Sequence, residues 1–158
     1  ETFLESPLAD EIIEEGMSEV NLPGRLEVVS ANPLVVLDGA HNEDAARALA
    51  SALPEIFPET RRIVVLGMLG PRDPEEVIKE IVSLHPEVVI CCTLASERAI
   101  TSQELAQTVQ THGVESETAS DPTEAIERAL VLSSEEDLIL VTGSFYLLSA
   151  TRASLSFD

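Results

Sequence analysis

The stretch LVVLDGAHNEDAARALA, residues 34–50, decides the fold. Its first four residues, Leu34–Leu37, are apolar throughout, as in a β-strand that is buried on both faces of a parallel sheet. The alanine-rich part that follows has the composition of a helix. The polar turn Asp38–His41 separates the two. A buried strand that passes through a short turn into a helix is the first half of a β-α-β unit, so this stretch predicts a parallel sheet.

The same alternation continues along the chain. Further strands are predicted at 26–30, 63–66, 88–92 and 138–141, with a short segment at 114–118; helices are predicted at about 42–53, 74–84, 102–112 and 122–132, and a last one begins near Ser144. We therefore expect an α/β fold, a Rossmann-like open, mainly parallel sheet of about six strands flanked by helices.

Three helices carry start signals of their own. Asp73-Pro74 and Asp121-Pro122 each place an aspartate as N-cap before a proline at the first helical position. Thr101 and Glu104 have the spacing of a capping box. These signals predict where the helices begin.

The first 24 residues differ from the rest. Leu8–Met17 has the pattern of one acidic amphipathic helix, and Asn21–Gly24 would end it. We expect residues 1–24 to be a linker helix or the tail of a preceding domain, and residues 25–158 to form one domain. A chain that begins at Glu1 without methionine is expected to be a fragment.

The composition excludes several classes of partner. The 158 residues are 44% hydrophobic, enough for a core, and 9 Lys+Arg stand against 29 Asp+Glu, a net charge of −20. Such a surface repels phosphate backbones and anionic lipids, so neither nucleic acid nor a membrane is an expected partner. No apolar stretch reaches bilayer length and no signal peptide is present, which favours a cytoplasmic protein. Cys91 and Cys92 are expected to be reduced thiols in the core.

Polar residues follow three of the predicted strands, in the segments 38–42, 67–73 and 142–146. Ligands of doubly wound sheets bind at the carboxyl ends of the strands, so these loops are the candidate site. Each also has a structural interpretation, with Asn42 and Ser144 as N-caps and His41 as a turn residue. The chain has neither a GxxxxGK[ST] phosphate loop nor a GxGxxG motif, and no Cys or His pattern indicates a metal site.

Four motifs together resemble a known family. PGRLEV (23–28), LDGAHN (37–42), GML (67–69) with Asp73, and VTGSFY (141–146) occur in the order and spacing of the C-terminal domain of bacterial bifunctional dihydrofolate synthase/folylpolyglutamate synthases, which are relatives of the Mur ligases. The resemblance covers about residues 8–152. Arg72 stands where the family usually has a lysine.

The resemblance implies an ATP-dependent amide ligase that adds L-glutamate to dihydropteroate or folate through an acyl phosphate. In that family an N-terminal ATPase domain holds most contacts to ATP and Mg²⁺ and the folate pocket, and the C-terminal domain closes over it. The expected partners are therefore this N-terminal domain, ATP, L-glutamate and folate or dihydropteroate, in a monomer. The alternative is a stand-alone nucleotide- or amino-acid-binding module of the same fold without catalysis.

The resemblance also implies roles for single residues. Arg25 would contact the ATP phosphates, and Asp38 would hold the hinge or the ribose side of the nucleotide. His41 would be the catalytic residue near the transferred phosphoryl group, in contact with ATP and glutamate, and Ser144 would border the glutamate with it. No metal ligand is expected on this chain. Gly39 is expected to let the turn form, and both Asp38 and His41 are expected to serve function more than folding.

Overall fold

The apolar run at 34–37 forms a buried strand, as its composition predicts. In the computed structural model, which describes residues 22–58, 60–70 and 73–155, Val35, Val36 and Leu37 are completely buried in β2. The predicted helix at 8–17 and Arg72 lie outside the described residues. The elements are β1 (Glu27–Ala31), β2 (Leu34–Asp38), α2 (Glu43–Ile56), β3 (Arg62–Leu66), α3 (Glu75–Val82), β4 (Val88–Cys92), α4 (Ser102–Thr111), β5 (Ser116–Ala119), α5 (Pro122–Leu132), β6 (Leu138–Thr142) and α6 (Phe145–Ser154).

The six strands of the described ranges form one sheet in the order β1-β2-β6-β3-β4-β5. Every pair is parallel except β1 with β2, which is antiparallel. The predicted fold class, an open and mainly parallel α/β sheet, is confirmed. Strand β6 lies between β2 and β3, so the chain returns to the middle of the sheet after building β4 and β5 at one side.

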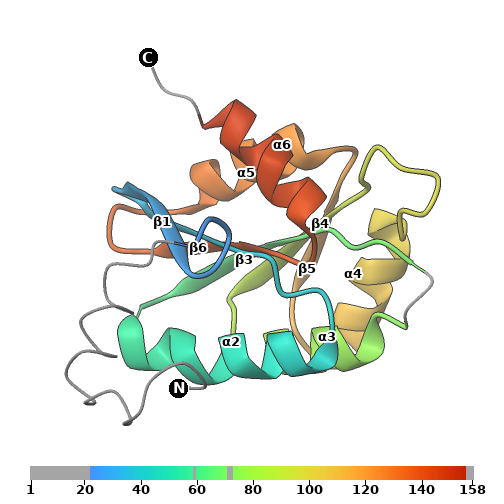
Figure 1. Ribbon diagram of the computed structural model, residues 1–158, viewed down its shortest axis with the longest axis horizontal. Coiled ribbons are helices and arrows are strands. Elements are labelled where there is room, and N and C mark those ends of the chain that lie inside the picture. Colours follow the sequence, from blue (N-terminus) through green and yellow to red (C-terminus); the bar gives the residue numbers. More distant parts are fainter. Residues whose placement is uncertain (1–21, 59, 71–72, 156–158) are drawn as a thin grey trace, which may run out of the picture.

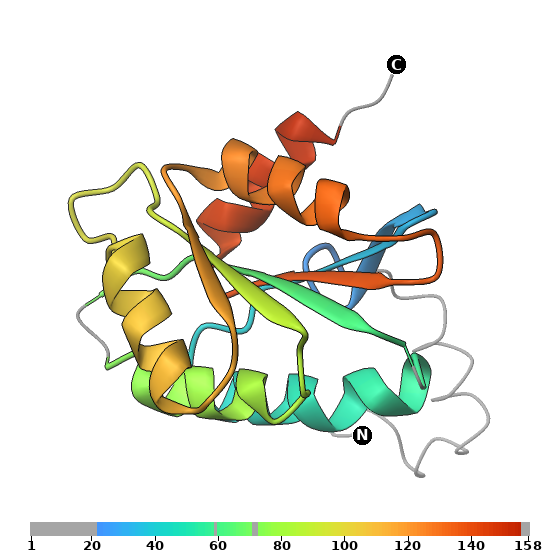
Figure 2. The same cartoon turned by 180° about the vertical axis from the view of Figure 1, so that it is seen from behind.

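Helices cover both faces of the sheet. Side chains of α2, α3 and α4 pack on one face around Val36, Val64 and Leu140. Those of α5 and α6 pack on the other face around Val35, Ile139 and Val141. Figures 1 and 2 show this three-layer arrangement, with α5 and α6 above the sheet and α2 and α3 below it. Alternate side chains of one strand thus pack in the hydrophobic cores on opposite faces of the sheet, as the continuous apolar pattern predicts.

The helix starts agree with the sequence in two of three cases. The Asp121 carboxylate accepts from the backbone N–H of Thr123 and Glu124, and the capping box of Thr101 and Glu104 is present. The third prediction is wrong, because Pro74 and not Asp73 occupies the N-cap position of α3. Asp73 still accepts from the N–H of Glu75 at 3.0 Å, so it satisfies one helix donor from one residue further out.

The two cysteines lie in β4 and are free and buried, as expected. Burial raises the pKa of both thiols to about 12, and this keeps them protonated at neutral pH. Among the described residues, no helix has the length and apolar character that a membrane crossing requires.

Candidate functional site

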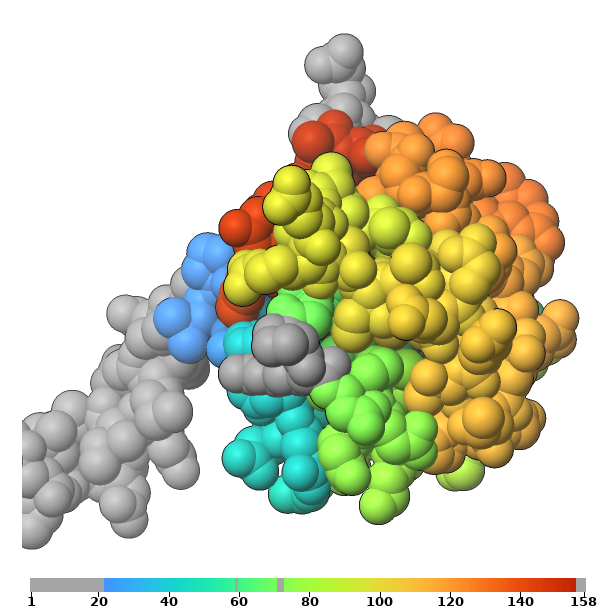
Figure 3. Space-filling view, turned by 90° about the vertical axis from the view of Figure 1, so that its right-hand side faces the viewer, coloured from blue at the N-terminus to red at the C-terminus, as the bar shows by residue number. Residues whose placement is uncertain are grey.

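The strand register brings the three predicted polar loops together. Thr142, the last residue of β6, pairs with Asp38 of β2 on one side and with Leu66 of β3 on the other. The loops after these strands therefore leave the sheet at the same level and side by side. This is also where the strand order reverses, the usual ligand position in an open parallel sheet. Figure 3 shows this edge, with the loop that precedes α4 in yellow beside the red start of α6 and the cyan start of α2.

Asp38 is a buried carboxylate with a structural task. Only 6% of the residue is exposed, and burial raises the pKa of its carboxyl against the opposing effect of two hydrogen bonds. One oxygen accepts from the N–H of Leu26 at 3.0 Å and the other from the N–H of Ala40 at 2.9 Å. Asp38 thus ties the loop before β1 to the turn after β2. The loss of Asp38 would leave two backbone donors without their acceptor, so a contribution to folding is expected beside the functional role, which stays a prediction.

The loop that carries Arg25 is held by further contacts. The carbonyl of Gly24 accepts from the N–H of Gly39 at 2.8 Å, and the N–H of Gly24 donates to Glu27 at 2.5 Å. The same Glu27 carboxylate pairs with Arg152 of α6. The loop is therefore fixed to β2 and α6, while the Arg25 side chain is exposed beside them.

His41 and Ser144 line one cavity of about 300 Å³ between the loops. Its lining residues are His41, Leu69, Gly70, Arg98, Gly143, Ser144, Phe145 and Tyr146. The Nδ1 atom of His41 lies 2.8 Å from the carbonyl oxygen of Gly39, which fixes the orientation of the ring. The two residues that the sequence associates with glutamate are thus neighbours in space.

Asn42 and Ser144 are both helix N-caps in the structure, as the sequence predicts. The Asn42 amide oxygen accepts from the N–H of Ala45, and Ser144 Oγ accepts from the N–H of Tyr146. Only 5% of Ser144 is exposed, so the cap is well protected. Helices α2 and α6 both begin at this edge of the sheet, so the partial positive charge of each helix N-terminus lies there.

Arg25 and Asp38 line a separate cavity, of about 290 Å³, against Ala45, Ala48 and Ala52 of α2. The four predicted site residues are therefore divided between two cavities. Phe145 lies between them, with the guanidinium carbon of Arg25 5.2 Å from its ring centre and the His41 ring centre 6.1 Å away.

Arg98 is a site residue that sequence reasoning missed. It belongs to the loop between β4 and α4 and lines the cavity of His41 and Ser144. No motif around it indicated a ligand. The one available signal was its position after a buried strand, at the edge where the other loops meet.

Gly39 has a different reason from the expected one. Its φ does not lie in the left-handed region, so the turn itself does not require glycine. A Cβ atom at this position would instead lie 2.5 Å from the ring of Phe145. The absence of a side chain at Gly39 leaves room for the Phe145 ring against the backbone.

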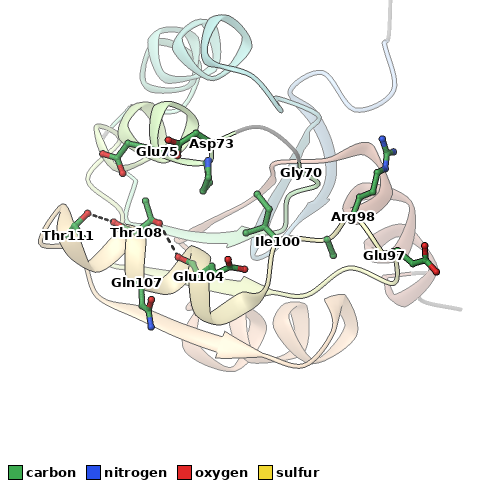
Figure 4. Close-up of a pocket in the computed structure, with 12 residues that line it drawn as sticks. Gly70, Asp73, Glu75, Glu97, Arg98, Ile100, Glu104, Gln107, Thr108 and Thr111 are labelled. Atoms are coloured by element: carbon green, nitrogen blue, oxygen red, sulfur yellow. Dashed lines mark hydrogen bonds between the residues drawn. The ribbon is translucent and has the colours of Figure 1, made fainter.

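A larger cavity, of about 780 Å³, lies between α3, α4 and the loop that joins β4 to α4. Figure 4 shows Glu75 and Glu104 at its walls, together with Arg98 and Ile100. Its lining shares Gly70 and Arg98 with the His41 cavity but includes none of the four predicted site residues. Size alone therefore does not identify the functional site.

The described ranges hold no group of three or more His, Cys, Asp or Glu side chains placed to bind a metal ion. The one buried carboxylate at the site, Asp38, uses both oxygens for backbone N–H groups.

Comparisons with known proteins place the chain in a family. The family model described as "Mur ligase, glutamate ligase domain" matches residues 24–145. The chain is 31% identical over 144 residues to the probable bifunctional folylpolyglutamate synthase/dihydropteroate synthase of Halobacterium salinarum, which covers 90% of this chain and 17% of that protein.

Two solved structures have the same fold along nearly the whole chain. The first is E. coli FolC in complex with DHPP and ADP, with a TM-score of 0.82 at 26% identity over 94% of this chain and 35% of that one. The second is a bifunctional folylpolyglutamate synthase/dihydrofolate synthase with Mn, AMPPNP and L-glutamate bound, with a TM-score of 0.80 at 32% identity over 97% and 36%. The chain thus spans about a third of the length of these two proteins.

Proposed function

The chain belongs to the Mur ligase family through its glutamate ligase domain, and from this premise we propose that it is the C-terminal part of an ATP-dependent ligase that joins L-glutamate to a folate or to dihydropteroate. The observation that carries the proposal is the cavity shared by His41, Ser144 and Arg98 at the edge where three strands end. A similar protein has been solved with a nucleotide analogue, Mn and L-glutamate bound.

We assign L-glutamate to the His41 cavity because its lining suits an amino acid with two carboxylates. The Arg98 guanidinium can bind a carboxylate through two hydrogen bonds. The N-terminus of α6 adds a partial positive charge beside Ser144. In the proposed reaction the glutamate amine attacks an acyl phosphate, forms the amide C–N bond and releases inorganic phosphate and a proton. His41 then lies at the cavity wall where the amine and the phosphate would meet.

We assign the nucleotide to the side of Arg25. The guanidinium is exposed at the end of a loop that Asp38, Gly39 and Glu27 hold in place, so it can reach a phosphate group without rearrangement of the backbone. Mg²⁺ would neutralise charge on the phosphates when bound. Because the described residues offer it no carboxylate cluster, we assign the ion and the phosphate loop to the N-terminal part that the longer relatives carry. The cytoplasmic location and the monomeric state stay predictions.

A ligation assay tests the proposal. The longest natural polypeptide that contains this chain should form a glutamyl amide from dihydropteroate or a folate, with one ADP and one phosphate released per bond. The isolated chain should form none and should bind MgATP weakly, with a dissociation constant above the micromolar range, because the phosphate loop is absent from its sequence. If the longer polypeptide binds ATP or glutamate but forms no product, the ligase proposal is wrong. That result would favour the alternative of a binding module without catalysis.

A further inference from the structure

Phe145 occupies a position that core packing does not explain. It is the first residue of α6, directly after the Ser144 cap, and 44% of it is exposed. The apolar residues of α6 that do pack in the core are Leu147 and Leu148, which are buried. Core packing thus accounts for Leu147 and Leu148, whereas the Phe145 ring lines the cavity of His41 and Ser144.

The backbone around the ring is shaped to admit it. A Cβ atom at Gly39 would lie 2.5 Å from the Phe145 ring, and one at Gly24 would lie 3.1 Å from it. These two glycines come from the loop before β1 and from the turn after β2, and a hydrogen bond of 2.8 Å joins them. The ring therefore lies against two loops at once, in a space that the absence of a side chain at Gly39 leaves open; Gly24 also has a φ of +73° and a methyl group of Leu148 at 2.9 Å from the Cβ position.

The ring also contacts the two site residues that those loops carry. The Arg25 guanidinium carbon lies 5.2 Å from the ring centre, within the range of a cation–π contact. The His41 ring meets it edge to face, with centres 6.1 Å apart and planes at 60°. One aromatic side chain thus lies close to both a guanidinium and an imidazole.

We propose that Phe145 is a positioning residue, which fixes the Arg25 guanidinium and the His41 imidazole relative to each other across the two cavities. An exposed arginine samples many rotamers. The Phe145 ring favours those rotamers that keep the Arg25 guanidinium over its face. The ring lines the cavity assigned to L-glutamate, and its proposed effect on ATP is indirect, through Arg25. The link to ATP and to turnover rests on the proposed function of Arg25 and His41, whereas the placement of the two side chains does not.

Phe145→Leu tests the proposal in the complete ligase, with Phe57→Leu as the matched control. Phe57 ends α2 near the start of β3, at the opposite edge of the sheet, and is also partly buried. Phe145→Leu should raise the KM for ATP about fivefold, the loss expected for one cation–π contact of this exposure, and should also lower kcat. Phe57→Leu should leave both constants near those of the wild type. Unchanged constants in Phe145→Leu, or equal losses in both variants, would overturn the proposal.

Gly39→Ala provides a second variant, because its new methyl group would push the ring away without removing it. It should raise the KM for ATP as Phe145→Leu does, and the double variant should be no worse than Gly39→Ala alone, since the two changes act through the same ring. Fully additive losses in the double variant would contradict the proposal.

NMR of the chain separates this proposal from the proposed function. The side-chain protons of Arg25 should be shifted upfield by the ring current of Phe145, and this shift should disappear in Phe145→Leu but persist in Phe57→Leu. If Arg25→Ala left ATP kinetics unchanged, the assigned role of Arg25 would fail while the ring-current result still supported the placement. If the Arg25 shifts were the same with and without Phe145, the placement itself would be wrong.

Discussion

Replacing His41 by alanine is expected to lower the kcat of the complete ligase by roughly 10- to 100-fold, with smaller changes in the KM values for ATP and L-glutamate. The Gly39 carbonyl and the Phe145 ring hold the imidazole at the wall of the cavity it shares with Ser144. Charge moves onto the departing phosphate as the amide forms, so a hydrogen bond from His41 would strengthen in the transition state. A hydrogen bond to a charged group contributes about 1.5–3 kcal/mol, which gives the expected loss.

His85→Ala is the control for this experiment. His85 is exposed and lies just before β4, at the opposite edge of the sheet. Its replacement should leave kcat within about twofold of the wild type, the range expected for a surface residue. If His41→Ala instead raised one KM and left kcat intact, His41 would contribute to ground-state binding and not to the chemical step.

A second large effect is expected at Gly143, where alanine should reduce the free energy of unfolding by about 3–5 kcal/mol. The residue has a φ of +108°, a conformation that side chains rarely adopt. A Cβ atom would also lie 2.7 Å from the carbonyl oxygen of Gly67 and 2.9 Å from a methyl group of Leu66. Backbone strain and overlap with a neighbouring loop would therefore act together. Urea denaturation of the chain measures the loss.

Gly113→Ala separates the two causes. Gly113 has a φ of +76° but no atom within 4 Å of the position that a Cβ would take. Alanine there should cost only the strain of a left-handed residue, about 1–2 kcal/mol. Equal losses at both positions would mean that the close approach of the Gly67 loop adds nothing at Gly143.

Local patterns predicted the fold of this chain well. The buried run at 34–37 became the second strand because it has no polar face to expose, and the alternation of strands and helices fixed the parallel sheet. Helix starts were predictable where a side chain itself caps the helix, as at Thr101 and Asp121. The start of α3 was misplaced by one residue because Asp-Pro permits a cap at either position, and the sequence does not decide between them.

The candidate site was only partly predictable. The three polar loops were found because each follows a buried strand. The position of Arg98 at the site and the contacts of Asp38 and Phe145 could not be predicted, because they depend on which loops lie side by side. The strand order determines this, and it is a property of the whole sheet. Gly39 shows the same limit, since its neighbour Phe145 lies more than a hundred residues later in the chain.

The central claim is that this chain presents separate groups to ATP and to L-glutamate. The most direct test measures the KM for each substrate in Arg25→Ala and Ser144→Ala variants of the complete ligase, with Thr101→Ala as a second loss of a hydroxyl N-cap, at a residue that lines neither of the two cavities. Arg25→Ala should raise the KM for ATP at least about tenfold, the loss of a contact to a charged group. Ser144→Ala should raise the KM for glutamate about two- to tenfold, the loss of one uncharged contact, and Thr101→Ala should change neither. Weaker use of ATP with unchanged glutamate kinetics in Ser144→Ala would contradict the account.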